Sequence, residues 1–143
     1  GYTTDLADML IGFGASAIGS GPMDYVQNEP NVRLYMERAA KSGLAVARGR
    51  ELDEDDRLRA TLIETLMCAM QVDVAAICQS FGRTPETLGI DLTRLDTLQA
   101  DGLVEVDGWH WRVPEDKRLF LRIPCSLFDG YLGQGSARHA RAV

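Results

Sequence analysis

The sequence has few cysteines, few aromatic residues and no long hydrophobic run. Its 143 residues contain three cysteines, and aromatic residues make up 7% of the chain. The longest apolar-leaning stretch, residues 9 to 18, is interrupted by Gly12, Gly14 and Ser16, whereas a membrane-spanning helix needs about 20 apolar residues. An odd number of cysteines favours a reducing compartment, and no secretory signal pattern opens the chain. We therefore expect a cytoplasmic protein that does not enter a membrane.

Complete catalytic and metal-binding motifs are also missing. Zinc and iron–sulfur sites usually use close cysteine pairs such as C-x-x-C, but here the cysteines lie far apart at apolar positions, where we expect buried structural thiols. The chain has no G-x-S-x-G elbow and no P-loop, and neither histidine has an obvious catalytic partner. We expect no metal site and no catalytic residue in this chain. The residues concerned are Cys68, Cys78, Cys125, His110 and His139.

Positive charge is scarce. Fifteen Lys and Arg stand against 21 Asp and Glu, which gives a net charge of -6. A negative net charge repels phosphate backbones, so we expect no binding to nucleic acid. The composition, 45% hydrophobic and 25% charged, suits one small domain or a small domain with an appendage.

Residues 1 to 32 differ in composition from the rest of the chain, because they contain no Lys or Arg and five of the fourteen glycines. Small residues at 12 to 19 suit a strand or loop that another surface approaches closely. A helix is predicted over Asn31 to Lys41 and ends at Gly43. Leu44 to Arg50 is predicted as a connector.

From Asp53 onward the pattern is typical of a compact helical domain. An acidic first turn suits the positive end of a helix dipole and precedes an apolar stripe. Two further helices, a β-hairpin with a type I′ turn at Asp107-Gly108, and a last helix follow; we expect Pro124 to bend or break that last helix. The predicted segments are a helix from Asp53 with its stripe at Leu58, Leu62, Ile63, Leu66, Met67 and Met70, helices over Asp73 to Phe81 and around Leu92 to Leu98, strands over Leu103 to Val106 and Trp109 to Val113, and a helix from about Asp116.

These elements predict an α+β fold that is mostly helical. Helices followed by a hairpin give a winged-helix-like order, which raises the question of DNA binding. The helix that would enter the groove, Asp91 to Asp101, has one Arg against three Asp. Its negative charge argues against a DNA-reading role.

Three local features leave a functional and a structural interpretation open. The segment Gly12 to Gly19 exposes peptide groups that could meet a flat ligand, or it is simply a tightly packed strand. Tyr25-Val26-Gln27-Asn28 is either a functional cluster or a polar loop. Arg48 could clamp a carboxylate bidentately or form a surface ion pair.

The order of these motifs resembles the C-terminal part of the oxygen-independent coproporphyrinogen III oxidase family. The resemblance covers essentially the whole chain. It is carried by Gly1-Tyr2-Thr3-Thr4, Gly12 to Gly19, Tyr25-Val26-Gln27-Asn28, Arg48-Gly49, Asp55-Asp56-x-x-Arg59, Asp101-Gly102-Leu103-Val104, and Arg122, Cys125 and Phe128-Asp129-x-Tyr131-Leu132.

The resemblance implies a radical S-adenosylmethionine enzyme of haem biosynthesis. In this family, two propionates of coproporphyrinogen III are oxidatively decarboxylated to vinyl groups, which gives protoporphyrinogen IX. The [4Fe-4S] cluster binds to a C-x-x-x-C-x-x-C motif in an N-terminal barrel that this sequence lacks. We therefore expect residues 1–50 to be the tail of the catalytic domain and residues 51–143 to be a winged-helix-like cap that helps to cover the substrate cleft. The isolated fragment is expected to be inactive and to bind no cofactor.

The resemblance also assigns candidate site residues. Ile18, with Ala17 and Gly14 beside it, is expected to contact a second S-adenosylmethionine, together with a Gln that would precede Gly1. As residues on the substrate side, the resemblance implies Tyr25, Gln27 and Asn28 at the barrel mouth and Arg48 beside a substrate propionate.

Two alternatives remain open from the sequence. One is a radical S-adenosylmethionine haem chaperone, which shares the barrel. The other is a non-enzymatic winged-helix-like module that binds a protein partner through exposed Trp109 and Trp111. In either case, exposed small apolar surface in residues 1 to 32 favours self-association of the fragment.

Overall fold

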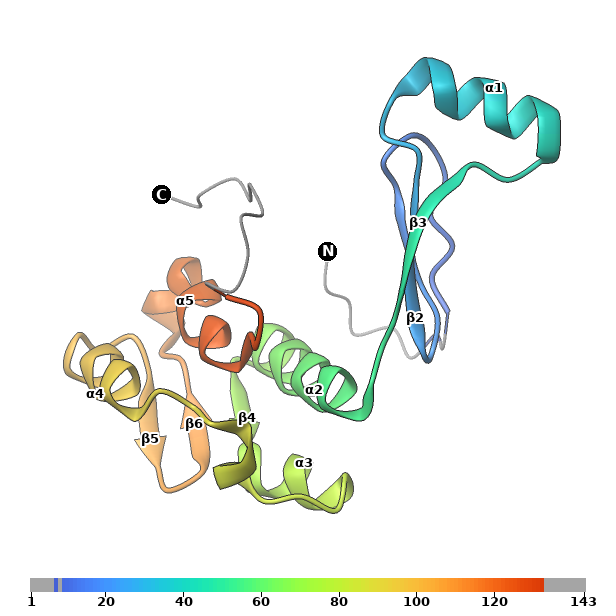
Figure 1. Cartoon of the computed structure of the whole chain (residues 1–143). Coiled ribbons are helices and arrows are strands. Elements are labelled where there is room, and N and C mark those ends of the chain that lie inside the picture. The colour runs from blue at the N-terminus through green and yellow to red at the C-terminus, as the bar shows by residue number, and fades with distance from the viewer. Residues whose placement is uncertain (1–6, 8, 133–143) are drawn as a thin grey trace. The chain divides into compact units, whose positions relative to one another are not determined.

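A computed structural model describes residue 7 and residues 9–132, and it combines helices with two small sheets (Figure 1). Mixed helix and sheet is the class that the sequence predicts. The chain divides into two compact units between Arg57 and Leu58, within helix α2 (Glu54–Ala69). The motif Gly1-Tyr2-Thr3-Thr4 and His139 lie outside the described residues.

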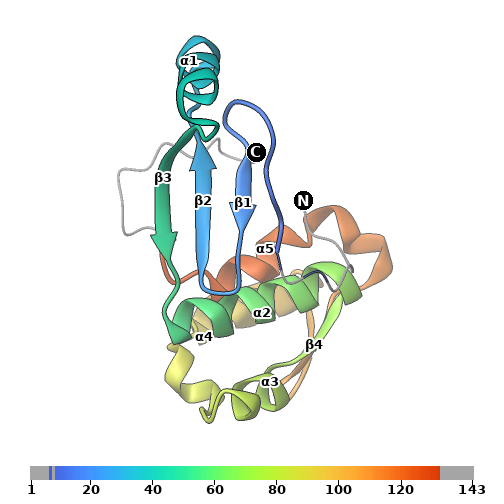
Figure 2. The same cartoon turned by 90° about the vertical axis from the view of Figure 1, so that its right-hand side faces the viewer.

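A three-stranded antiparallel sheet forms the N-terminal unit (Figure 2). Its strands are β1 (Ile18–Ser20), β2 (Asp24–Asn28) and β3 (Val46–Glu51), in the order β1-β2-β3. The prediction of a connector over Leu44 to Arg50 is therefore wrong. All six residues of β3 are exposed, so the strand has no buried face that an alternating hydrophobic pattern could reveal.

Helix α1 (Val32–Ser42) connects β2 to β3 and confirms the helix predicted from Asn31. The Asn31 side chain caps it by accepting a hydrogen bond from the Leu34 N–H at 3.1 Å. Gly43 ends it with φ 74°, a left-handed conformation that glycine adopts without steric cost.

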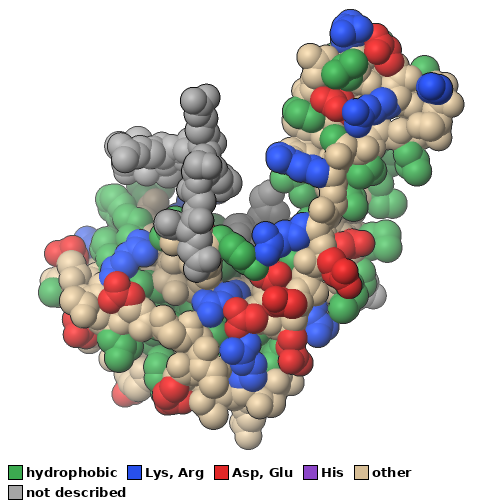
Figure 3. Space-filling view, in the orientation of Figure 1, with side chains coloured by type: hydrophobic (Ala, Val, Ile, Leu, Met, Phe, Trp, Pro, Cys, Tyr) green, Lys and Arg blue, Asp and Glu red, His purple; other side chains and the backbone are tan. Residues whose placement is uncertain are grey.

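This N-terminal unit has almost no hydrophobic core. No residue of α1 is buried, and Phe13 is 86% exposed. Hydrophobic side chains are visible on its surface in Figure 3. Among the described residues up to Arg57, those that are buried are Gly19, Glu29, Ala45 and Leu52. Hydrogen bonds between strands and loops must therefore supply much of its order.

The C-terminal unit contains the predicted series of helices and one strand that the sequence pattern did not predict. That strand, β4, lies between two helices and pairs antiparallel with β6, so that the sheet order is β4-β6-β5. The elements are α2 (Glu54–Ala69), β4 (Gln71–Asp73), α3 (Val74–Ser80), η1 (Pro85–Leu88), α4 (Leu92–Ala100), β5 (Glu105–Asp107) and β6 (His110–Arg112). At three residues, β4 is too short to show an alternating pattern.

The predicted apolar stripe of α2 forms one side of the core of this unit. Leu58, Leu62 and Leu66 are completely buried. Trp111 from β6 is also completely buried and stacks on Phe128, with ring centroids 4.9 Å apart. Aromatic stacking adds to the energy of burial, so the two rings hold the C-terminal segment to the sheet.

The hairpin differs from its prediction by one residue. Asp107 pairs with His110, so the loop is Gly108-Trp109 and not Asp107-Gly108. Of these two loop residues only Gly108 has a positive φ, 58°, which fits a type II′ turn better than the predicted type I′ turn.

The prediction that Trp109 and Trp111 are exposed is also wrong. Trp111 is completely buried, and Trp109 is half-buried against the same core. The interaction module that would bind a partner through both tryptophans therefore lacks its proposed surface.

The last predicted helix is broken into short pieces. They are the 3₁₀ turn η2 (Glu115–Phe120), the helix α5 (Arg122–Cys125) and the 3₁₀ turn η3 (Ser126–Phe128). Pro124 lies within α5 and has no N–H to donate, which agrees with the expected break. In the described part of the chain, no helix is long and apolar enough to cross a membrane.

The core of the C-terminal unit can be tested with two leucines of opposite exposure. Leu62 is completely buried and Leu119 is 94% exposed. We expect Leu62→Ala to lower the free energy of unfolding by about 2–5 kcal/mol and Leu119→Ala to change it by less than about 0.5 kcal/mol. Urea unfolding followed by circular dichroism measures both. Equal effects of the two substitutions would contradict the packing described here.

Candidate functional site

Four of the predicted site residues lie on one face of the N-terminal sheet. Ile18 pairs with Gln27, and Gln27 pairs with Arg48, so these three residues form a row across β1, β2 and β3. Directly opposed residues of an antiparallel sheet point to the same side. Tyr25, two residues before Gln27, shares this side. We call this surface, with Ile18, Tyr25, Gln27 and Arg48, the candidate face.

The segment before β1 is a loop that is fastened to the end of β2. The Asn28 side-chain nitrogen donates to the carbonyl oxygens of Gly12 and Gly14, at 3.0 Å each. The backbone N–H of Asn28 donates to the Ala17 carbonyl at 2.9 Å. Asn28 was predicted to lie on the substrate side, but its amide nitrogen is used to hold this loop.

A second amide holds the loop from the candidate face. The Gln27 Nε2 donates to the Ser16 carbonyl at 3.1 Å. Its Oε1 accepts a hydrogen bond from Arg48 Nε at 2.7 Å. The Arg48 side chain is exposed, but the hydrogen bond from its Nε to Gln27 restricts its orientation.

Three residues that the sequence did not single out complete the support of the loop. Ser16 is a non-glycine residue with φ 62°, a conformation that costs energy for an L-residue. Its N–H donates to the Glu29 carbonyl at 3.1 Å. The Tyr35 hydroxyl accepts from the Gly14 N–H at 3.2 Å. Because Ser16 is neither Gly nor Asn, its positive φ has no clear signal in the sequence.

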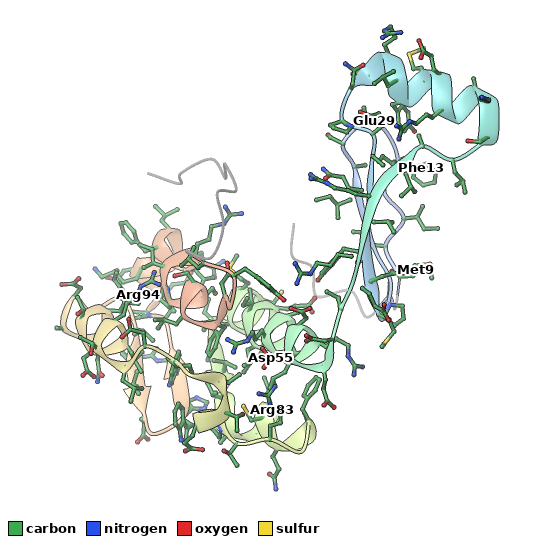
Figure 4. The ribbon with its side chains drawn as sticks, viewed as in Figure 1. Met9, Phe13, Glu29, Asp55, Arg83 and Arg94 are labelled. Atoms are coloured by element: carbon green, nitrogen blue, oxygen red, sulfur yellow. The ribbon has the colours of Figure 1, made fainter. Side chains whose placement is uncertain are left out.

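The carboxylate of Glu29, which is labelled in Figure 4, is buried beside α1 at one end of the sheet. One oxygen accepts from the Asn31 N–H at 3.1 Å, and the other lies 3.3 Å from Arg38 Nη1. A buried carboxylate is costly unless it is paired and hydrogen-bonded, and both conditions are met. Glu29 therefore fixes the junction of β2 and α1 and takes no part in the candidate face.

The loop itself has features that suit a flat, polar group such as the adenine ring of S-adenosylmethionine. Ile18 is 56% exposed, and a Cβ added at Gly14 would meet nothing within 4 Å. In the described part of the chain, the backbone N–H groups of Phe13 and Ala15 have no hydrogen-bond partner. An apolar side chain beside free peptide groups is a common arrangement in ligand sites. The residues present thus fit the ligand that the resemblance implies.

An iron–sulfur cluster does not fit the described residues. Nowhere among them do three His, Cys, Asp or Glu side chains gather as a ligand set. Cys78 and Cys125 are buried, and Cys68 is half-buried. Burial raises the pKa of the Cys125 thiol to about 12 and also raises that of Cys78, whereas cluster ligands are thiolates.

Comparison with known proteins identifies relatives over the whole chain. The family described as "HemN C-terminal domain" matches residues 52–134. A protein of Bradyrhizobium diazoefficiens named oxygen-independent coproporphyrinogen III oxidase is 44% identical over 143 residues, which is 100% of this chain and 32% of that protein. A protein of Cereibacter sphaeroides with the same name is 38% identical over 98% of this chain and 31% of its own length.

A solved structure is also similar to this chain. It is reported as "Coproporphyrinogen III oxidase (HemN) from Escherichia coli is a Radical SAM enzyme", with a TM-score of 0.79, 35% identity, and coverage of 92% of this chain and 30% of that one. The chain belongs to the HemN C-terminal domain family, which confirms the resemblance inferred from the motifs. It spans about a third of the length of the relatives that it matches.

The fastening of the loop by Asn28 can be tested by substitution. Asn28→Leu removes the two side-chain hydrogen bonds, and Asn28→Asp replaces the donor by a carboxylate that faces two carbonyl oxygens. We expect amide hydrogen exchange at Ser16 and Ala17 to accelerate by about 10-fold in Asn28→Leu and by more in Asn28→Asp.

The matched control is Asn31→Asp, because Asp and Asn cap helices about equally well. It should leave exchange at Ser16 and Ala17 unchanged. Unaltered exchange in both Asn28 variants would show that the loop does not depend on Asn28.

Proposed function

We propose that this chain is the C-terminal part of an oxygen-independent coproporphyrinogen III oxidase, a radical S-adenosylmethionine oxidoreductase of haem biosynthesis. The observation that carries the proposal is the 44% identity over all 143 residues to a protein of that name. The similarity to the structure of an E. coli radical SAM enzyme supports it. The whole protein would convert two propionates of coproporphyrinogen III to vinyl groups, with loss of one CO₂, one hydrogen atom and one electron from each side chain.

The proposed domain boundary at residues 50/51 lies seven residues before the boundary between the two units, at Arg57 and Leu58. Residues 1–50 would be the end of the barrel-like catalytic domain, and the exposed apolar side chains of the N-terminal unit support this, since such surface is usually covered in a complete protein. Residues 51–143 would form a winged-helix-like domain. The order of helices, the hairpin and the pairing of β4 with β6 support this assignment.

The candidate face and the loop before β1 would together serve two ligands. Ile18, Ala17 and Gly14 would contact a second S-adenosylmethionine, and Tyr25, Gln27 and Arg48 would face the substrate. S-adenosylmethionine bound to a [4Fe-4S] cluster elsewhere in the complete protein supplies radical chemistry in this family. This chain would contribute binding and orientation, and its C-terminal unit would help to exclude water from the reacting groups.

Arg48 would contact a propionate of the substrate. A planar guanidinium recognises a carboxylate through paired N–H donors. The Nε of Arg48 is held by Gln27, which leaves the terminal nitrogens for a ligand.

The names of the relatives favour the oxidase over the alternative of a haem chaperone. Location in the cytoplasm and self-association of the isolated fragment remain predictions.

The proposal can be tested in the full-length protein that carries this chain. After anaerobic reconstitution, we expect coproporphyrinogen III to be converted to protoporphyrinogen IX, as measured by chromatography of the oxidised porphyrins. Ile18→Asp should weaken binding of the second S-adenosylmethionine by about 10-fold or more, because an apolar contact is replaced by a charge, while cluster content is unchanged.

Val32→Asp is the matched control. Val32 is similarly exposed, at 63%, and lies in the first turn of α1, where a carboxylate is favourable. Absence of vinyl product from the wild-type protein would refute the proposed activity. An unchanged affinity for the second S-adenosylmethionine in Ile18→Asp would refute the assignment of Ile18.

A further inference from the structure

Gln27 binds both Arg48 and the loop before β1 through a single side-chain amide. Its oxygen accepts from Arg48 Nε at 2.7 Å, and its nitrogen donates to the Ser16 carbonyl at 3.1 Å. Only one orientation of the amide satisfies both partners, since a guanidinium can only donate and a carbonyl can only accept. The donor on Arg48 and the acceptor on Ser16 therefore fix which end of the Gln27 amide faces each of them.

The bond to Ser16 acts on the segment that would meet the cofactor. Ser16 has φ 62°, so its backbone needs support from its surroundings. That support comes from both sides of the residue: its N–H is bound to the Glu29 carbonyl, and its own carbonyl is bound to Gln27. Ala17 and Ile18 follow directly, so their placement depends on how Ser16 is held.

The bond to Arg48 acts on the group that would meet a carboxylate. Anchoring Nε removes part of the rotamer freedom that a long exposed side chain loses on binding. Within the described part of the chain, the two terminal nitrogens of Arg48 make no hydrogen bond. They remain available as a pair of donors, and the neutral Gln27 does not offset the positive field of the guanidinium as a neighbouring carboxylate would.

We propose that Gln27 is a positioning residue that sets the cofactor segment at Ser16–Ile18 and the carboxylate-binding guanidinium of Arg48 at the same time. The inference rests on the proposed function, since it assigns a role to each end of the site. It goes further by making the two binding events depend on one neutral amide. A carboxylate at position 27 would hold Arg48 but not Ser16, and an aliphatic side chain would hold neither.

The test uses the full-length protein with Gln27→Leu, Gln27→Glu and Arg48→Gln. Two quantities are measured: the KM for coproporphyrinogen III at saturating S-adenosylmethionine, and the Kd of the second S-adenosylmethionine by equilibrium dialysis. Ser20→Ala is the matched control, because Ser20 lies on the same side of the sheet and has no role in the proposed site. Iron content and circular dichroism report cluster loading and folding in every variant.

We expect Gln27→Leu to raise both KM and Kd by about 10-fold, the size expected for losing hydrogen bonds that involve a charged group and a strained loop, while kcat changes less than KM. Gln27→Glu should raise Kd as Gln27→Leu does. Arg48→Gln should raise KM and leave Kd near its wild-type value. Ser20→Ala should change neither quantity.

The outcomes separate this inference from the proposed function. If Arg48→Gln raises KM but Gln27→Leu alters neither KM nor Kd, Gln27 is not a positioning residue, although the proposed substrate contact stands. If Gln27→Leu alters only one quantity, the dual role is refuted. If Arg48→Gln leaves KM unchanged, the proposed propionate contact itself is wrong.

Discussion

Hydrogen bonds from the side-chain amides of β2 to the preceding loop are the interactions on which the candidate site depends. Asn28 holds the Gly12 and Gly14 carbonyls, and Gln27 holds the Ser16 carbonyl. A loop with glycines and a residue at positive φ has many alternative conformations. Two neighbouring amides hold three of its carbonyl groups and so restrict these conformations. The adjacent pair Gln27-Asn28 therefore does more than provide polar surface.

The two units are stabilised by different means. The C-terminal unit has a continuous core in which the leucines of α2 pack with Trp111 and Phe128. The N-terminal unit has paired strands, fastened loops and an ion-paired buried Glu29, but its described residues include hardly any buried apolar side chain. Hydrogen bonds in water contribute only modestly to net stability, whereas burial of apolar surface contributes most of the favourable free energy of folding. A unit of this kind is consistent with a segment that relies on the rest of a longer protein.

How far the sequence could predict the structure depended on burial and on the length of each element. The helix from Asn31 to Gly43 and the stripe of α2 were predictable because capping residues and 3.6-residue periodicity are local signals. The strands β3 and β4 were missed, since one has no buried face and the other has three residues. Local features and a family resemblance both indicate Ile18, Tyr25, Gln27 and Arg48 as candidates, but their common face follows only from the strand register. The partners of Ser16 were not predictable, because they join residues 11 to 13 positions apart.

The sheet that carries the candidate face is held by hydrogen bonds and not by a hydrophobic core of its own. Native-state hydrogen exchange on the isolated 143-residue chain tests this most directly, because exchange reports local stability residue by residue. We expect the amides of Val26 and Gln27 to exchange at least about 100-fold faster than those of Leu66 and Trp111, and to become strongly protected in the full-length protein. Equal protection of both units in the isolated chain would contradict the account.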